Sequence, residues 1–241
     1  MKIYDSLVQK DGLLKKEILT PNSFIVQYQE SEVTYKYYLF DSIEDFKKYY
    51  FSIPKFCRNC YEVILDKPQK LRYDIDINNV KTVDIQPLPL VLQFKQSLEE
   101  KLNTEVLIYL SKDIQERKFS CHMVVTKYYA RNHEECFSLC YVLSQLADKA
   151  LQPYIDFNTY HKTQSLRLEG STKYGDVRYK YLYGHNDLSP RFDEGIVGNT
   201  SDCVLIMPKV IINKKEIFRK ANGNGTTGNK FKSHWSKYTI S

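Results

Sequence analysis

Segments in which hydrophobic and polar residues alternate predict the strands of this chain. Side chains of a β-strand point to opposite faces in turn, so alternation is typical of a strand with one buried face. The segment Leu71–Ile77 is the clearest case. Six further segments have the pattern or the composition of strands: Thr34–Phe40, Glu62–Leu65, Val106–Leu110, Lys118–Thr126, Ser165–Glu169 and Val177–Tyr183.

Hydrophobic residues spaced three or four positions apart predict helices. The helices that we expect are Ile43–Tyr50, Leu90–Leu102 and His133–Leu151. The last of these has the strongest helical spacing, and Pro153 lies just beyond its end. The mixture of strands and helices predicts an α+β fold built on a mainly antiparallel sheet, with helices covering one face.

The segment Leu71–Asn78, with the sequence LRYDIDIN, has one acidic face. In a strand Asp74 and Asp76 project from the same face, about 7 Å apart along the strand. Two carboxylates this close repel each other unless a cation joins them. Mg²⁺ and Mn²⁺ are hard cations that prefer oxygen ligands, so they are the natural partners. The alternative is a solvent-facing strand that carries two acids.

The segment Glu116–Val125, with the sequence ERKFSCHMVV, has a second polar face. Alternation places Lys118, Ser120 and His122 together and the hydrophobic residues on the other side. A cation, a hydroxyl and an imidazole that point the same way suit a triphosphate. A serine nucleophile with a histidine base is an alternative, but no G-x-S-x-G turn accompanies them. The other alternative is a half-exposed strand in which the histidine has no functional role.

A third segment, YIDFNTYHKTQSLRLEGSTKYG, supplies another acid and two more cations. Asp156 is the acid, and a strand over Ser165–Glu169 followed by a turn presents Arg167 and Lys173. Arginine offers a fork of donors to phosphate oxygens, and lysine offers a point charge. The alternative is a surface hairpin with ordinary salt bridges, because Glu169 could pair with either cation.

Composition narrows the class of protein. The chain has 241 residues, of which 42% are hydrophobic and 27% charged, and this excludes disorder throughout. No run approaches the roughly 18 apolar residues that span a bilayer, and the first residues lack an apolar signal segment. Six cysteines are too few for a disulfide scaffold. We therefore expect a soluble, intracellular protein.

Positive charge is concentrated at the end of the chain. Residues 209–241 contain eight Lys or Arg and one Glu, a net charge of +7, against +6 for the whole chain, so residues 1–208 carry −1. Within this extension, residues 221–230 are rich in Gly and Asn, which is typical of a linker. A basic extension can bind nucleic acid by neutralising phosphates, although a solvated end explains the charge equally well.

Together the three polar segments contain the residue types that two-metal nucleotidyl transfer requires. Two Mg²⁺ or Mn²⁺ ions about 4 Å apart would activate a 3′-hydroxyl and stabilise the leaving pyrophosphate. Cations and hydroxyls would hold the incoming triphosphate in line. Two other classes stay open. One is a non-catalytic module that binds single-stranded nucleic acid through the basic tail and tyrosines, and the other is a metal-dependent nuclease at the same site.

In motif order the chain resembles the archaeo-eukaryotic primase superfamily, especially primase–polymerases and the primases of large DNA viruses and plasmids. That family carries two acids spaced Asp-x-Asp or Asp-x-Glu, then Ser-x-His, then an Asp after a hydrophobic residue. Here these look like Asp74-Ile75-Asp76, Ser120-Cys121-His122 and Ile155-Asp156. The resemblance covers about half of the chain, roughly residues 60–185.

The resemblance implies a DNA primase or primase–polymerase in DNA replication. Its fold would be an RRM-like palm over about residues 61–208, beside a small N-terminal α/β module over about 1–60, in one catalytic domain. The implied metal ligands are Asp74, Asp76 and Asp156, and the implied nucleotide-binding residues are Lys118, Ser120, His122, Arg167 and Lys173. The implied partners are a single-stranded DNA template, NTP or dNTP, and a replicative helicase or polymerase, without a membrane.

The chain departs from many relatives in lacking a zinc-binding element and a helicase domain. The pairs Cys57/Cys60 and Cys136/Cys140 have suggestive spacing, but no second Cys-x-x-Cys exists and Cys140 belongs to a hydrophobic stripe. We therefore expect two Mg²⁺ or Mn²⁺ ions and no zinc. The expected protein is either a stand-alone small primase or an excised catalytic domain.

Overall fold

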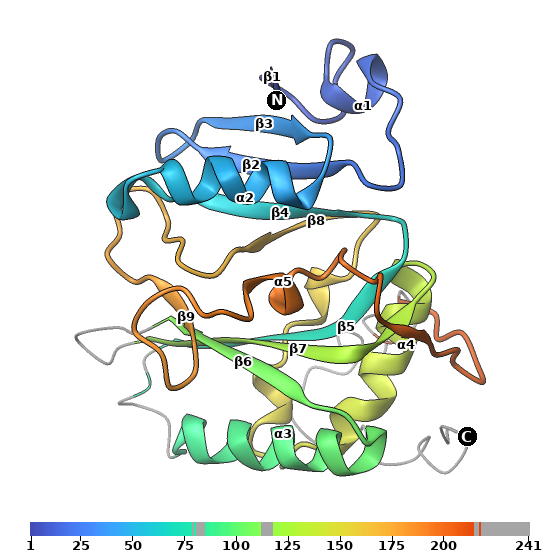
Figure 1. Cartoon of the computed structure of the whole chain (residues 1–241). Coiled ribbons are helices and arrows are strands. Elements are labelled where there is room, and N and C mark those ends of the chain that lie inside the picture. Colours follow the sequence, from blue (N-terminus) through green and yellow to red (C-terminus); the bar gives the residue numbers. More distant parts are fainter. Residues whose placement is uncertain (79, 81–84, 112–117, 215–216, 218–241) are drawn as a thin grey trace.

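Two β-sheets lie one above the other in the computed structural model, which describes residues 1–78, 80, 85–111, 118–214 and 217 (Figure 1). Strand pairing within the sheets is mainly antiparallel, and a few helices pack against them. The chain therefore has the α+β fold that the sequence predicted.

The first sheet has the strand order β1-β3-β2-β4-β8. Its strands are β1 (Lys2–Tyr4), β2 (Phe24–Gln29), β3 (Tyr35–Phe40), β4 (Cys60–Leu65) and β8 (Thr163–Arg167). Helix α2 (Ile43–Ser52) packs on this sheet through Phe46 and Tyr50, in a cluster rich in aromatic rings. The helix begins here because the Ser42 side chain accepts a hydrogen bond from the main-chain N–H of Asp45.

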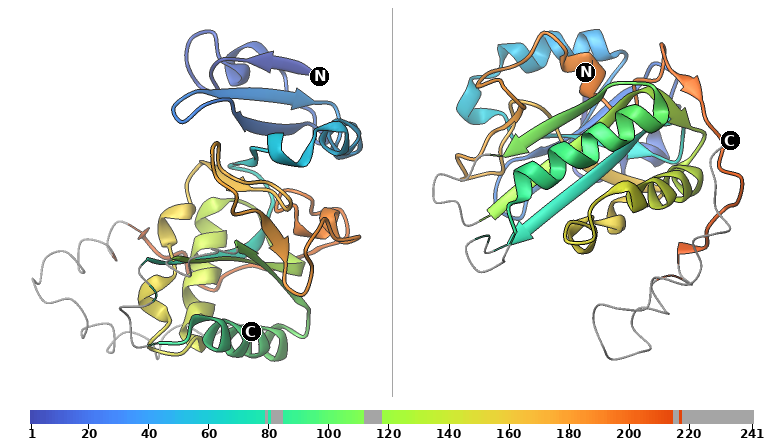
Figure 2. Two further views of the ribbon diagram at one scale, coloured as in Figure 1. Left: turned by 90° about the vertical axis from the view of Figure 1, so that its left-hand side faces the viewer. Right: turned by 90° about the horizontal axis from the view of Figure 1, so that it is seen from below.

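The second sheet has the order β5-β7-β6-β9, and β10 pairs with β7 as well. Its strands are β5 (Gln69–Asn78), β6 (Val106–Ser111), β7 (Lys118–Ala130), β9 (Lys180–Leu182) and β10 (Val204–Leu205). All pairs are antiparallel except β10 with β7. Helices α3 (Pro87–Leu102) and α4 (His133–Leu143) cover one face of this sheet (Figure 2).

Alternation along the second sheet separates a hydrophobic face from a polar one. Tyr73, Ile75 and Ile77 of β5 are buried in the core beneath α3 and α4, together with Cys121 and Met123 of β7. Each large apolar side chain buried in this way contributes about 1.5–3 kcal/mol to stability. The predicted alternation is therefore confirmed, and the polar residues between these positions face the first sheet.

Side-chain and main-chain contacts join the two sheets. The buried Glu62 carboxylate of β4 accepts hydrogen bonds from the main-chain N–H groups of Val197 (2.9 Å) and Gly198 (2.6 Å). Beyond β8, the Gly170 N–H donates to the Lys180 carbonyl of β9 at 2.6 Å. A hydrophobic cluster fills part of the space between the sheets: Ile64, Leu107, Tyr109, Val124, Leu166, Leu182 and Val197.

The helix predicted over His133–Leu151 ends at Leu143, so this boundary was wrong. The Ser144 hydroxyl donates to a carbonyl of the last helical turn, and the Asp148 carboxylate accepts the N–H of Ala150. Short polar side chains that bond to the nearby backbone offer it an alternative to helical pairing. The hydrophobic spacing persists through this segment because its residues still face the core.

Most strands also differ from their predicted bounds: β7 continues past Thr126 to Ala130, and β4 begins at Cys60 rather than at Glu62. The strand predicted over Val177–Tyr183 is the shorter β9, because the Asp176 carboxylate accepts the N–H groups of Val177 and Arg178 and forms a turn there. The strand predicted over Ser165–Glu169 begins and ends earlier, as β8.

Several short elements escaped prediction. They are β1, β2 and β10, the helices α1 (Leu13–Lys16) and α5 (Phe192–Gly195), and the 3₁₀ turns Lys55–Cys57, Ser144–Leu146, Gln152–Tyr154 and Phe157–Thr159. Strand β2 shows the reason. Phe24 and Val26 belong to one hydrophobic cluster and Ile25 to another, so both faces are covered and the sequence does not alternate.

Most of the predicted basic extension lies outside the described residues. The structure describes residues 209–214 and 217 of it, whereas the predicted linker at 221–230 is not among them. Within the described part of the chain, none of the helices has the length and apolar character needed to cross a membrane.

Replacing Gly195 with Ala is expected to destabilise the protein by about 1–3 kcal/mol. A Cβ at this position, where α5 ends, would lie 2.6 Å from Cζ of Tyr109, a buried residue of β6. Urea denaturation would measure the loss. The double variant Gly195→Ala/Tyr109→Phe should recover part of it, because it removes the crowded hydroxyl. Equal stability of Gly195→Ala and the wild type would contradict this close packing.

Candidate active site

The two acids of β5 lie directly opposite the Ser-x-His segment of β7. In the antiparallel register Asp74 faces His122 and Asp76 faces Ser120. His122 Nε2 lies 3.1 Å from Asp74 Oδ1, and Lys118 Nζ donates to Asp76 Oδ2 at 3.1 Å. The tertiary structure therefore brings the first two predicted polar faces together on one surface of the second sheet.

A row of polar residues continues from Asp76 across the whole sheet. Asp76 pairs with Ser120, Ser120 with Ser111 of β6, and Ser111 with Lys180 of β9. Directly paired residues of antiparallel strands point to the same face, so Lys180 lies on the face of the acids. It is 1% exposed, and its Nζ has no hydrogen-bond partner among the described residues.

Sequence reasoning missed Lys180 and Ser111. Lys180 lies between two tyrosines within a predicted strand, so the sequence indicated that it shares a face with neither of them. The sequence did not indicate which strand would pair with β9. Pairing of β9 with β6 places this lysine in the row, and a single sequence does not specify such long-range pairing.

Arg167 and Lys173 reach the same site from the first sheet and from the loop that follows it. Arg167 Nη1 donates to the Arg178 carbonyl at 3.1 Å, and its guanidinium helps to lower the pKa of Asp74. Partial burial lowers the pKa of Lys173, and neighbouring Arg167 lowers it further, while Asp76 opposes the shift. Both predicted cations therefore lie within electrostatic reach of the acid pair.

Asp156 comes next to β5 through its main chain. Its N–H donates to the Asp74 carbonyl at 2.8 Å, and Ile155 forms an isolated bridge with Ile75. Its carboxylate, however, accepts the Asn158 N–H at 2.8 Å and caps a 3₁₀ turn. The third motif is thus adjacent to the acid pair, with its carboxylate engaged locally.

Glu169, one of the residues that the sequence left open as a partner for the cations, has a different partner. Its carboxylate accepts the Ser189 N–H at 2.8 Å and the Ser189 hydroxyl at 2.9 Å. Among the described residues, neither Arg167 nor Lys173 forms an ion pair with this acid. Glu169 therefore anchors the loop before α5.

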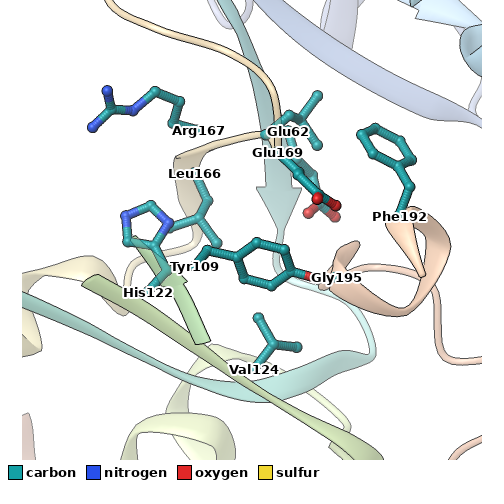
Figure 3. Close-up of a pocket in the computed structure, with 10 residues that line it drawn as sticks. Glu62, Tyr109, His122, Val124, Leu166, Arg167, Glu169, Phe192 and Gly195 are labelled. Carbon is teal, nitrogen blue, oxygen red and sulfur yellow. The ribbon is translucent and has the colours of Figure 1, made fainter. Parts of the chain in front are cut away.

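A small cavity of about 20 Å³ lies between the sheets beside this site (Figure 3). His122 and Arg167 lie on one side of it, and Phe192 and Gly195 lie on the other. The volume is room for about one water molecule, which is too little for a nucleotide. The side chains of Asp76 and Lys118 are 39% and 26% exposed, so a larger ligand would approach the acids from that end.

The carboxylate oxygens of Asp74 and Asp76 suit a divalent cation, but they are too few to complete its coordination. Carboxylate oxygens are the ligands that Mg²⁺ and Mn²⁺ prefer, and Asp76 Oδ1 is buried without a hydrogen-bond partner among the described residues. Yet no group of three or more His, Cys, Asp or Glu side chains in that part of the chain is arranged to hold a metal ion. Asp74 and Asp76 could therefore bind a cation whose other ligands come from elsewhere.

Three of the four cysteines considered for zinc lie in two separate hydrophobic cores. Cys60 lies in the core of the first sheet, and Cys136 and Cys140 lie in the core beneath the second. All are free thiols. The fold therefore keeps the Cys60 thiol apart from those of Cys136 and Cys140.

Burial dominates the protonation of His122. It lowers the pKa of His122 to about 4, and Lys180 acts in the same direction while Asp74 opposes it. Burial alone would raise the pKa of Asp74, but His122 and the nearby cations outweigh this effect and hold the pKa below its usual value. At neutral pH the pair is therefore a neutral imidazole beside a carboxylate.

Acidification is expected to destabilise the metal-free protein between pH 6.5 and about 4. The pKa of His122 is lower in the folded state than in the unfolded chain, so the unfolded chain takes up a proton first as the pH falls. This contributes a loss of about 3 kcal/mol across the window. Urea denaturation in EDTA would measure it, and the variant His122→Asn should show a flatter profile. Identical profiles for both proteins would contradict the assignment.

The chain is similar to a curated viral protein. The chain is 25% identical over 210 residues to a protein of African swine fever virus named "Putative helicase/primase complex protein". The match covers 78% of this chain and 20% of the relative, so the chain spans about one fifth of the relative's length. No protein-family model matches.

Proposed function

We propose that the chain is a DNA primase or primase–polymerase, a nucleotidyltransferase that acts on single-stranded DNA. The observation that carries the proposal is the direct pairing of Asp74 with His122 and of Asp76 with Ser120 across β5 and β7. This pairing unites two motifs that are far apart in the sequence. The similarity to a viral protein with a helicase/primase name supports a role in DNA replication.

The residues divide into two proposed roles. Asp74 and Asp76 would hold Mg²⁺ or Mn²⁺, with Asp156 beside them. When bound, the ions would supply activation of the attacking 3′-hydroxyl and stabilisation of the leaving pyrophosphate. The nucleotide would be held by a set of donors and cations around the acids: Lys118, Ser120, His122, Arg167 and Lys173.

The resemblance to the archaeo-eukaryotic primases also leads to a proposed fold and proposed partners. The second sheet with α3 and α4 would be the RRM-like palm of the archaeo-eukaryotic primases. The substrates would be NTP or dNTP and a single-stranded DNA template. A replicative helicase or polymerase is the proposed protein partner, because the viral relative is named for a helicase/primase complex.

Primer synthesis on unprimed single-stranded DNA tests the proposal. The protein, labelled nucleotides and Mg²⁺ or Mn²⁺ should yield short products that require both template and metal. Extension that occurs only from a supplied primer would indicate a polymerase that needs an initiating partner. Degradation of labelled DNA without nucleotides would replace the proposal with a nuclease, and salt-sensitive DNA binding without either reaction would replace it with a binding module.

A further inference from the structure

The 3₁₀ turn Lys55–Cys57 presents an aromatic ring to solvent. Its middle residue, Phe56, is 75% exposed. The turn itself is anchored, because the Cys57 N–H donates to the Pro54 carbonyl at 2.8 Å and the Tyr28 hydroxyl of β2 donates to the Cys57 carbonyl at 3.1 Å. The fold therefore fixes the backbone that carries this exposed ring.

The first residue of the turn, Lys55, is held against two tyrosines. Its Nζ lies 5.4 Å from the ring centroid of Tyr179 and 5.0 Å from that of Tyr181, and the two rings stack with their centroids 6.2 Å apart. A cation at this distance from an aromatic face is attracted to it. Lys55 is nevertheless exposed. The turn thus offers a positioned positive charge directly beside the ring of Phe56.

The segment that follows β8 runs along the same side of the molecule as this turn (Figure 1). The two meet where the Thr172 N–H donates to the Arg58 carbonyl at 2.9 Å. Two residues further on, Tyr174 is 45% exposed, and its N–H donates to Gln29 Oε1 at 3.1 Å. A second exposed ring is therefore held near the first. We define the aromatic surface as Lys55, Phe56, Tyr174 and Tyr179.

Positive charge exceeds negative charge around the aromatic surface. Among the described residues of these segments and the loop beside Lys55, the cations are Lys55, Arg58, Lys173 and Arg178, and the acids are Asp176 and Asp187. Arg178 and Asp176 form an ion pair at 2.7 Å and so add no net charge. The excess of cations favours a polyanion over an acid-poor or basic partner.

Exposed rings beside cations suit single-stranded nucleic acid. Unpaired bases can stack on aromatic side chains while cations follow the phosphates, whereas a duplex keeps its bases stacked inside. The aromatic surface also leads to the candidate active site through Lys173. Asp76 acts on the pKa of Lys173, so this ammonium lies within electrostatic reach of the acid, and the next residue is Tyr174 of the aromatic surface.

We propose that the aromatic surface binds the single-stranded DNA template, with bases stacked on Phe56 and Tyr174 and a phosphate held by Lys55. Naming the strand a template rests on the proposed function, whereas binding of the strand does not require catalysis. Stacking accepts every base, so this surface binds with little sequence preference. It delivers the strand along Lys173 toward the acids.

Replacement of Phe56 tests the stacking. Binding of a labelled oligothymidine of about 16 nucleotides to the full chain in EDTA would be followed by fluorescence anisotropy. Phe56→Ala should weaken binding about tenfold, and Phe56→Trp should keep the wild-type affinity. Phe56→Leu should behave like Phe56→Ala, because leucine is apolar but has no ring face. Since Phe56 is 75% exposed, all of these variants should unfold thermally at the wild-type midpoint.

Replacement of Lys55 tests the phosphate contact. In Lys55→Met the logarithm of the binding constant should fall less steeply with the logarithm of the salt concentration, by about 0.7 in slope. The matched controls are Lys10→Met and Ile18→Ala, which change an exposed lysine and a 96% exposed apolar residue on the segments that flank α1. Both controls should keep the wild-type affinity and slope.

Two results would overturn the inference. One is wild-type affinity for the oligonucleotide in Phe56→Ala, and the other is an equal loss of affinity in Ile18→Ala. In primer synthesis, Phe56→Ala should raise the DNA concentration that gives half of the maximal rate and leave the maximal rate unchanged. A lower maximal rate with an unchanged DNA requirement would also contradict a role in template binding.

Binding and synthesis together separate this inference from the proposed function. If the wild type makes primers and Phe56→Ala binds the oligonucleotide as tightly as the wild type does, the inference alone fails. If the wild type makes no primers but loses affinity on replacement of Phe56, the primase proposal fails and the aromatic surface stands as a single-strand binding site. If the full chain does not bind the oligonucleotide, the inference fails whatever the outcome of synthesis.

Discussion

Replacing Asp74 with Asn is expected to abolish nucleotide incorporation while leaving the fold intact. Asparagine has the shape of aspartate and keeps a side-chain oxygen beside His122, whose Nε2 lies 3.1 Å from Asp74 Oδ1. It lacks the negative charge that would hold a divalent cation on this face. The rate of primer synthesis should therefore fall on the order of 1,000-fold or more. Asp76→Asn should have the same effect, because both acids share the site.

The control for this experiment is Asp11→Asn. Asp11 lies before α1, its side chain is 83% exposed, and it pairs weakly with Lys16 at 3.4 Å. This variant should keep the wild-type rate. Thermal unfolding should give similar midpoints for all of these proteins. An Asp74→Asn protein that makes primers at the wild-type rate with the same metal requirement would refute the assignment of the acids.

Replacing Arg72 with Met is expected to cause the largest loss of stability. The Arg72 side chain is 1% exposed and lies in the interior beside β5. Its guanidinium donates to Gln69 Oε1 at 2.7 Å and to the Thr159 carbonyl at 2.9 Å, and it lies 5.0 Å from the ring centroid of Tyr160. Methionine fills similar volume but leaves both acceptors unpaired. The free energy of unfolding should drop by about 3–5 kcal/mol.

The same replacement should also loosen the segment beside the candidate active site. The Tyr160 hydroxyl donates to the Arg72 carbonyl, so Arg72 is bonded through both its side chain and its main chain to the segment that follows Asp156. Urea denaturation would measure the change in stability. Arg191→Met is the control, since Arg191 is partly exposed and pairs with two partly exposed acids, Glu105 and Glu194, so its loss of stability should be smaller than that of Arg72→Met. Equal effects of the two variants would contradict the burial of Arg72.

The local pattern of the site was predictable because strand alternation depends on neighbouring residues. The face shared by Asp74 and Asp76 follows from the period of a strand, and so does the face shared by Lys118, Ser120 and His122. The structure confirms this alternation. The proposed roles of these side chains in metal and nucleotide binding stay predictions.

Element boundaries were less predictable, because single side chains decide them. Ser144 and Asp148 form local hydrogen bonds that end a helix whose hydrophobic spacing continues. Asp176 shortens a strand in the same way. Strand β2 was not predicted, because both of its faces are covered and its sequence therefore lacks the alternation of hydrophobic and polar residues seen in other strands.

By itself, the sequence determined which side chains share a face within each strand, and hence the two acids and the donor-rich face. Only the tertiary structure decided that these faces meet, that Asp156 comes beside Asp74, and that Lys180 is buried in the same polar row. The physical reason is the separation in sequence of the residues that interact. Alternation is fixed by the geometry of a few consecutive residues, whereas strand pairing depends on the packing and hydrogen bonds of segments far apart in the chain.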